Sequence, residues 1–70
     1  MSNSAEKFGE NIKKYRKIKG YTQVRFAVLS GLSEDYVSQI ERGQKTPSFK
    51  RIEVIATTLG IKMKDLFDFE

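Results

Sequence analysis

The 70-residue sequence predicts a single all-α domain of five short helices. Three observations lead to this prediction. Apolar residues recur at the three- and four-residue spacing of a helix face along most of the chain. Serine, threonine or asparagine stands where a side chain can cap a helix, and glycine stands where a helix can end. A chain of this length buries only about 60% of its unfolded surface, so its core must be compact.

The first helix is expected from about residue 5 to residue 19. Asn3 or Ser4 is available to cap it, and residues 1 to 4 are otherwise expected to be flexible. Its apolar stripe consists of Phe8, Ile12 and Tyr15. Gly9 lies inside this helix at a cost of about 1 kcal/mol relative to alanine, which either a close backbone approach or simple tolerance explains.

The second helix is expected from its N-cap Thr22 to about Ser30, and the third from about residue 33 to residue 42. Between them, Gly31 can adopt the positive φ that ends a helix, and Ser33 can cap the next one. The apolar sets are Phe26, Ala27 and Leu29 in the second helix, and Tyr36, Val37 and Ile40 in the third. The small side chain of Ala27, four positions before Gly31, lets the two helices cross closely. This pattern is typical of a DNA-binding helix-turn-helix.

The fourth helix is expected from about residue 48 to residue 59, with either Thr46 or Ser48 as its cap. Its core stripe consists of Phe49, Ile52, Ile55, Ala56 and Leu59. A short fifth helix over about residues 62 to 67, with Leu66 facing inward, closes the bundle. Residues 1 to 70 are thus expected to form one domain.

Composition restricts the chemistry that is available to the chain. A net charge of +4 favours a polyanionic partner. Cysteine and histidine are absent, which argues against disulfides, a structural zinc site and a histidine pH switch. The longest apolar run, residues 26 to 29, is too short to cross a membrane, and the first ten residues lack the apolar segment of a secretory signal. We therefore expect a cytoplasmic protein.

Catalysis is not expected. The neighbouring carboxylates are Glu34 with Asp35, and the acidic residues 65, 68 and 70 near the C-terminus. Adjacent acids on a helix or tail are poor candidates for general acid–base work, which needs a pocket and shifted pKa values. A glycine-rich phosphate loop and a metal-ligand cluster are also missing from the sequence, so we expect no cofactor, metal or small-molecule ligand.

Together these motifs resemble the phage repressor/Cro family, also called XRE-type transcriptional regulators. The similarity extends over roughly residues 8 to 67, and implies a compact lambda-repressor-like fold. The residues that carry it are Thr22, Gln23, Ala27, Gly31, Ser33, Val37, Ser38, Ile40, Glu41, Arg42, Gly43, Pro47, Ser48, Leu59 and Gly60. Each one alone is weak evidence, but the whole set in register is specific.

The resemblance implies that Arg16 pairs with Glu41 and ties the first helix to the end of the third; an independent surface role for each is the alternative. It also implies contacts with the DNA backbone around the third helix. Arg25 replaces the acidic residue that the family usually has in the first turn of the second helix, and a nearby phosphate would compensate for this cation. The side chains expected near phosphates are Thr22, Gln23, Arg25, Arg42, Gln44 and Lys45.

The third helix is the candidate recognition helix, and its outward side chains are Glu34, Asp35, Ser38 and Gln39. Gln39 could pair with adenine through its amide, and Ser38 could bond to either kind of base edge. As base readers, Glu34 and Asp35 could accept a hydrogen bond only from cytosine. Alternatively, they stabilise the N-terminus of the helix or repel wrong sites.

Three apolar residues near the C-terminus, Met63, Phe67 and Phe69, either complete the core or form a dimer seam, as this region often does in the similar family. One monomer reads only a few base pairs. The expected function is therefore a sequence-specific, double-stranded DNA-binding transcriptional regulator, which binds a palindromic operator as a homodimer. The alternative is a protein-interaction module, such as an antitoxin or adaptor, built on the same fold.

Overall fold

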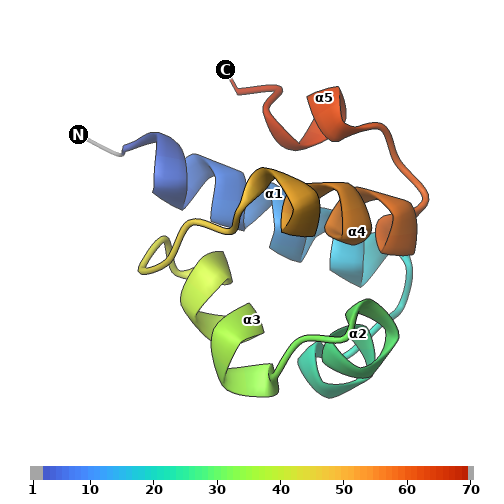
Figure 1. The fold of residues 1–70 in the computed structure, drawn as a ribbon. Helices are drawn as coiled ribbons and strands as arrows, with labels where there is room; N and C mark the ends of the chain where they lie inside the picture. Colours follow the sequence, from blue (N-terminus) through green and yellow to red (C-terminus); the bar gives the residue numbers. More distant parts are fainter. Residues whose placement is uncertain (1–2, 70) are drawn as a thin grey trace.

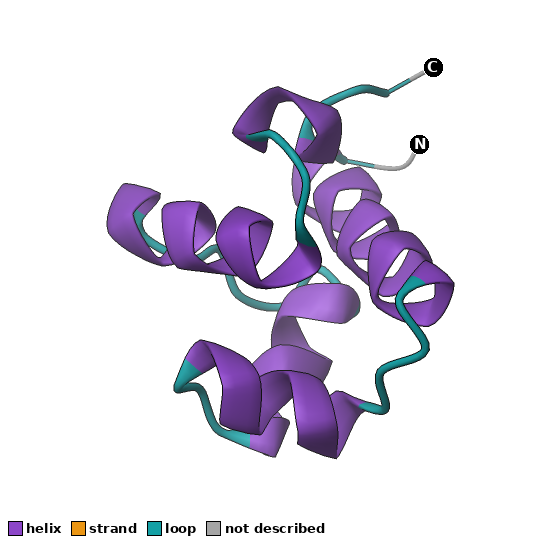
Figure 2. Cartoon of the chain, turned by 90° about the vertical axis from the view of Figure 1, so that its right-hand side faces the viewer, coloured by secondary structure: helices purple, strands orange, loops and turns teal. Residues whose placement is uncertain are grey.

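The computed structural model describes residues 3–69, and every regular element in that range is a helix (Figure 2). The helices are α1 (Ser4–Ile18), α2 (Gln23–Ser30), α3 (Glu34–Glu41), α4 (Phe49–Leu59) and α5 (Met63–Leu66). In Figure 1, α1 and α4 form the middle of the molecule, with α2 and α3 on one side and α5 on the other. The expected five-helix fold is confirmed. None of the described helices combines the length and the apolar character needed to cross a membrane.

Local capping explains where the helices begin. Asn3 accepts a hydrogen bond from the backbone N–H of Glu6, and the Glu6 side chain accepts one from the Asn3 backbone in return. Asn3 and Ser4 therefore begin α1 rather than forming a loose segment, while residues 1 and 2 lie outside the described residues. Ser48, not Thr46, caps α4, because its hydroxyl accepts from the backbone N–H of Arg51. Each cap satisfies a donor that the helix itself leaves free.

The turn between α2 and α3 has the geometry that the sequence predicts. Gly31 takes a left-handed conformation with φ 72°, which suits a residue without a Cβ atom. The backbone N–H of Leu32 donates to the carbonyl oxygen of Ala27 over 2.9 Å, and so closes the end of α2. Ser33 then caps α3 through the backbone N–H of Tyr36. The chain thus reverses within a few residues and fixes the angle between the two helices.

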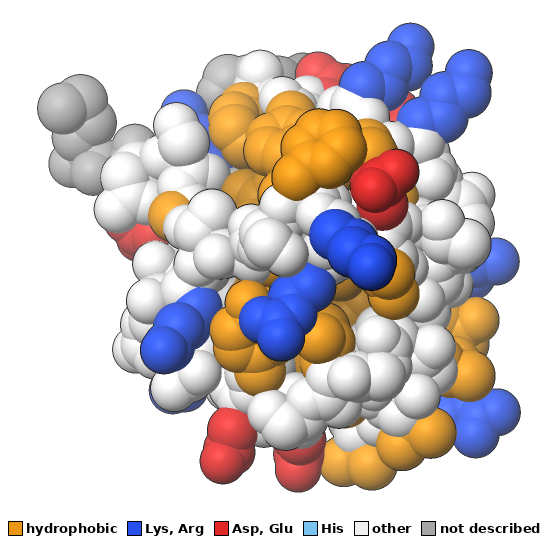
Figure 3. All heavy atoms as spheres, in the orientation of Figure 1, with side chains coloured by type: hydrophobic (Ala, Val, Ile, Leu, Met, Phe, Trp, Pro, Cys, Tyr) orange, Lys and Arg blue, Asp and Glu red, His pale blue; other side chains and the backbone are white. Residues whose placement is uncertain are grey.

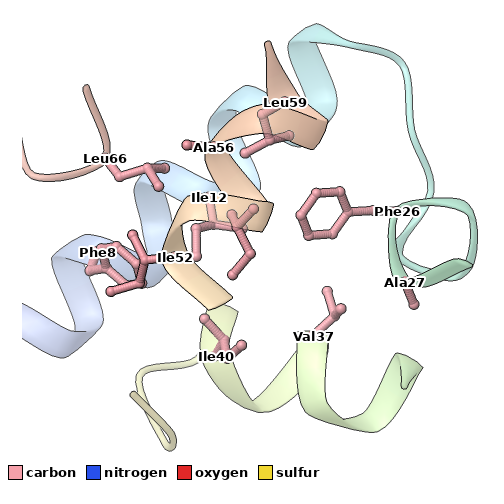
Figure 4. Packing of buried hydrophobic residues seen from close by; sticks show 11 residues of the cluster. Phe8, Ile12, Phe26, Ala27, Val37, Ile40, Ile52, Ala56, Leu59 and Leu66 are labelled. Atoms are coloured by element: carbon pink, nitrogen blue, oxygen red, sulfur yellow. The ribbon is translucent and has the colours of Figure 1, made fainter. Parts of the chain in front are cut away.

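The core is built from one apolar face of each helix, and these faces point toward one another (Figure 4). Phe26 from α2 is the largest of its fully buried side chains, with 1% of its surface exposed. The other buried apolar residues are Phe8, Ile12, Ala27, Val37, Ile40, Ile52, Ile55, Ala56, Leu59 and Leu66. The Asn11 side chain on α1 also donates to the carbonyl oxygen of Leu66, which anchors the end of α5. Because the inward residues of α3 lie in this core, its opposite face is left toward solvent.

Two residues of the expected apolar sets lie elsewhere. The apolar spacing predicts Phe49 in the core stripe of α4, but 71% of its surface is exposed. It is the first residue of that helix, and the core stripe begins only at Ile52, one turn later. Leu29 of α2 is 42% exposed, while Ser30 is buried beside it and donates its hydroxyl to the carbonyl oxygen of Phe26. A buried hydroxyl with a backbone partner thus takes the inward position.

Candidate nucleic-acid interface

The face of α3 that points away from the core carries the side chains expected to read bases. Val37, Ile40 and Glu41 are buried, so they define the inward side of the helix. The outward side chains are Glu34 and Asp35, which are exposed, and Ser38 and Gln39, which are partly exposed. At 100° per residue, this outward side continues into Arg42 just after the helix. The structure therefore brings the four expected residues to one solvent-facing surface.

Glu34 and Asp35 occupy the first turn of α3. Their carboxylates lie where the helix macrodipole favours negative charge, and Ser33 supplies the N-cap. Helices α2 and α4 have no acidic residue in their first turn, so α3 differs from its two neighbours in this respect. These carboxylates can thus stabilise α3 whether or not they contact a base.

A buried polar network joins α1, α2 and α3 beneath this surface. The guanidinium of Arg16 donates to both carboxylate oxygens of Glu41, over 2.6 Å from Nε and 3.1 Å from Nη2. Its Nη1 donates to the backbone carbonyl oxygen of Tyr21 over 2.8 Å. The side chains of the pair are only 8% and 3% exposed, which such complete pairing makes tolerable. The structure therefore contains the ion pair that the resemblance implies.

Gln23 belongs to the same network. Its Nε2 donates to Oε1 of Glu41 over 3.0 Å, so the first residue of α2 is tied to the end of α3. An amide nitrogen carries two hydrogens, and this bond uses one of them. The second hydrogen can still donate to an anion. Thr22 is similar, because its hydroxyl oxygen accepts from the backbone N–H of Arg25 while its own hydrogen can donate elsewhere.

The segment after α3 presents further donors to solvent. Arg42 is exposed, and its Nε donates to the carbonyl oxygen of Ser38 over 3.3 Å. Gln44 and Lys45 are also exposed, and the backbone N–H of Gln44 donates to the carbonyl oxygen of Gln39 over 2.8 Å. That bond folds the segment back against the end of α3. Basic and amide side chains therefore lie beside the outward face of the helix.

One pair beside α3 was not singled out in the sequence. Arg51 of α4 donates from Nη1 to the hydroxyl oxygen of Tyr36 on α3 over 3.3 Å. Its guanidinium carbon also lies 5.1 Å from the centre of the Tyr36 ring. The sequence pattern assigns Tyr36 to the apolar residues of the helix and gives no role to Arg51. Nothing in the sequence pattern pointed to the pair, because its two residues are 15 positions apart and on different helices.

A second, apolar surface lies away from α3. Phe67 is 48% exposed and stacks on Phe8 with ring centres 4.9 Å apart, and Phe69 meets Phe67 edge to face at 6.4 Å. Met63 and Phe69 are partly buried against the core. A hollow of ≈ 190 Å³ adjoins these rings and is also lined by Ala5 and Ile52. Figure 3 shows apolar side chains gathered near α5, whereas lysine and arginine side chains are spread over the whole face, some of them beside α5.

Comparison with known proteins gives matches of both sequence and structure. The family model described as Helix-turn-helix matches residues 12–66. The chain is 44% identical over 63 residues to the HTH-type transcriptional regulator SlrR of Bacillus subtilis. The matched region covers 89% of this chain and 41% of SlrR. The chain therefore spans about two fifths of the length of that relative.

Two solved structures are also closely similar. The restriction-modification controller protein C.AhdI of Aeromonas hydrophila superposes with a TM-score of 0.87 at 41% identity, covering 90% of this chain and 96% of C.AhdI. The biofilm master regulator SinR, solved in complex with DNA, superposes with a TM-score of 0.83 at 35% identity. That match covers 87% of this chain and 98% of the SinR chain. The turn and the two helices described above lie within the matched part of the sequence.

Proposed function

The chain belongs to the helix-turn-helix family of DNA-binding transcriptional regulators, which are not enzymes, and from this membership we propose that it binds a palindromic operator as a homodimer. Helix α3 enters the major groove of double-stranded DNA. The observation that supports this most directly is the polar outward face of α3. Hydrogen-bond donors flank it, from the start of α2 on one side and from the segment after α3 on the other. Such an arrangement matches a groove of base edges between two phosphate backbones.

In this proposal the four outward residues of α3 meet the base edges. Gln39 pairs through its amide with adenine, and Ser38 donates to or accepts from either kind of base. Glu34 and Asp35 accept from the amino group of cytosine where it is present and repel phosphates elsewhere. Their position in the first turn also stabilises α3, so the two roles are compatible.

The phosphate contacts come from both ends of the helix-turn-helix. At the start of α2, the free hydrogens of the Thr22 hydroxyl and the Gln23 amide point to a backbone phosphate, with Arg25 beside them. After α3, the contacts come from Arg42, Gln44 and Lys45, all three of which are exposed. Such contacts fix the register of the protein on the duplex without reading its sequence. Because Gln23 also bonds to Glu41, a phosphate held at α2 is mechanically linked to the end of α3.

Dimerisation places two copies of α3 in successive major grooves, roughly 34 Å apart. The apolar surface around Phe67 is the proposed seam, with Met63 and Phe69 supporting it from the core side. The ring of Phe67, which stacks on the buried ring of Phe8, gives this surface an exposed aromatic area that water solvates poorly. A seam on this side leaves α3 free for the duplex.

Selection of bound duplexes from a random-sequence pool tests the proposal. The expected result is a short half-site repeated in inverted orientation, with centres about one helical turn, or 10 base pairs, apart. Binding should weaken steeply as salt rises, by about 0.9 in log–log slope for each phosphate neutralised. A protein that binds no duplex at low salt, or whose binding ignores salt, would instead be a protein-interaction module on this fold.

A further inference from the structure

The contact between Tyr36 and Arg51 joins the side of α3 to the first turn of α4. Both side chains reach solvent at this point, and the hydrogen bond between them is exposed. Arg51 has no carboxylate within ion-pair distance among residues 3–69, where the Arg16–Glu41 pair is the one ion pair. Its positive charge is thus left for a partner outside the described part of the chain.

The direction of this hydrogen bond determines what the pair can bind. A guanidinium can only donate, so Tyr36 must accept through its hydroxyl oxygen. The hydroxyl hydrogen is therefore free to donate to a third group, as are the remaining N–H groups of Arg51. The pair presents donors and a positive charge but no charged acceptor. A phosphate, which is anionic and has only acceptor oxygens, suits both members at once.

The pair is also held in place beside the proposed groove-reading residues. Tyr36 lies three residues before Gln39, so the two side chains are neighbours on the surface of α3. Glu34 lies two residues before Tyr36, about 200° around the helix, and so on the far side of the outward face. The ring of Tyr36 lies under the guanidinium at 5.1 Å, which limits the orientations that Arg51 can adopt. Arg51 therefore loses less side-chain entropy when a ligand binds than an unrestrained arginine would.

We propose that Tyr36 and Arg51 bind one phosphate of the DNA backbone as a unit, and thereby fix how α3 is rotated about its axis in the groove. The inference rests on the proposed DNA-binding function and adds to it a phosphate site formed by α3 and α4 together. The hydroxyl hydrogen of Tyr36 donates to one phosphate oxygen, and a guanidinium N–H of Arg51 donates to another. The phosphate neighbours the base pair that Gln39 reads.

The test measures how binding depends on salt, with a fluorescein-labelled, mixed-sequence duplex as the probe in fluorescence anisotropy. Between about 50 and 200 mM potassium chloride, Arg51→Gln should make the log–log slope shallower by about 0.9, the value for one phosphate. Arg51→Lys should keep the slope, because it keeps the charge. Tyr36→Phe should weaken binding roughly three- to tenfold with the slope unchanged, because it removes one neutral donor.

Two comparisons show whether the residues act as a unit on DNA. Lys64→Gln removes the same charge from α5, which packs on α1 and α4, and should leave the slope almost unchanged. The double variant Tyr36→Phe/Arg51→Gln should bind about as weakly as Arg51→Gln alone, since the two residues share one phosphate. If the slope of Arg51→Gln equals that of Lys64→Gln, the phosphate site is refuted although DNA binding stands. If the unaltered chain binds no duplex, the proposed function itself fails.

Discussion

Gly9 of α1 lies directly against the backbone of Glu41 at the end of α3. A Cβ atom at residue 9 would lie 2.6 Å from the Glu41 carbonyl oxygen and 2.8 Å from its carbonyl carbon, closer than real Cβ atoms approach backbone. The glycine inside the first helix therefore reflects a close approach of two helices and not mere tolerance. This contact sets the distance between α1 and the helix proposed to read DNA.

Gly9→Ala should lower the free energy of unfolding by about 1–3 kcal/mol, because the added methyl group must push α3 away from α1. This is the net loss, after the gain of about 1 kcal/mol that alanine would bring to an unobstructed helix. Urea denaturation followed by circular dichroism measures the change. Glu10→Ala, at the next and exposed position, is the control and should stay within about 0.5 kcal/mol of the original protein. A Gly9→Ala protein that is more stable than the original would contradict the close approach.

Glu41→Gln should cost about 3–5 kcal/mol of stability, because it leaves the charge of Arg16 buried without its partner. Thermal and urea unfolding measure this loss. The double variant Arg16→Met/Glu41→Leu replaces the pair with apolar side chains of similar size, and should recover most of the lost stability.

The same double variant separates stability from DNA binding. Gln23 loses the carboxylate that positions it, so affinity for DNA should stay reduced even where stability returns. Full recovery of both stability and affinity would show that the network has no part in orienting Gln23.

The helices themselves could be predicted from the sequence because their signals are local. Ser33 caps α3 and Gly31 ends α2 through bonds within five residues, and these contacts depend little on the rest of the fold. Periodicity failed at Phe49 for a physical reason. Spacing identifies one side of a helix, but it does not show where along its axis the helix leaves the core.

The fine geometry of the interface could not be predicted in the same way. The bond from Gln23 to Glu41 joins residues 18 positions apart, and that from Arg51 to Tyr36 joins residues 15 apart. Each depends on how two helices cross and on which rotamer a long side chain adopts. The outward face of α3 was accessible from the sequence, because the burial of Val37 and Ile40 on one side places Gln39 on the other.

Gln39→Ala should weaken binding to the selected operator by about 1–3 kcal/mol and relax the preference at one base pair of each half-site. The reason is that a side-chain amide reads adenine through two hydrogen bonds, whereas alanine makes none. Anisotropy titrations with the operator and with single-base variants of it measure the effect. Lys45→Ala is the matched comparison, since loss of a phosphate contact should weaken all duplexes about equally. An equal loss on every duplex for Gln39→Ala would remove this residue from the base-reading set.

Phe67→Ser should weaken self-association at least about tenfold, because it removes an exposed aromatic ring from the proposed seam. Sedimentation equilibrium over a range of protein concentrations measures the change. Circular dichroism checks that the variant keeps its helices, because Phe67 also stacks on the core residue Phe8. Val28→Ser is the control, because Val28 is 67% exposed on α2, on the side of the molecule opposite α5 (Figure 1). If Val28→Ser impairs association and Phe67→Ser does not, the seam lies on α2. Operator binding should then respond to Val28→Ser as well, since two copies of α3 bind a palindrome together only when the copies are joined.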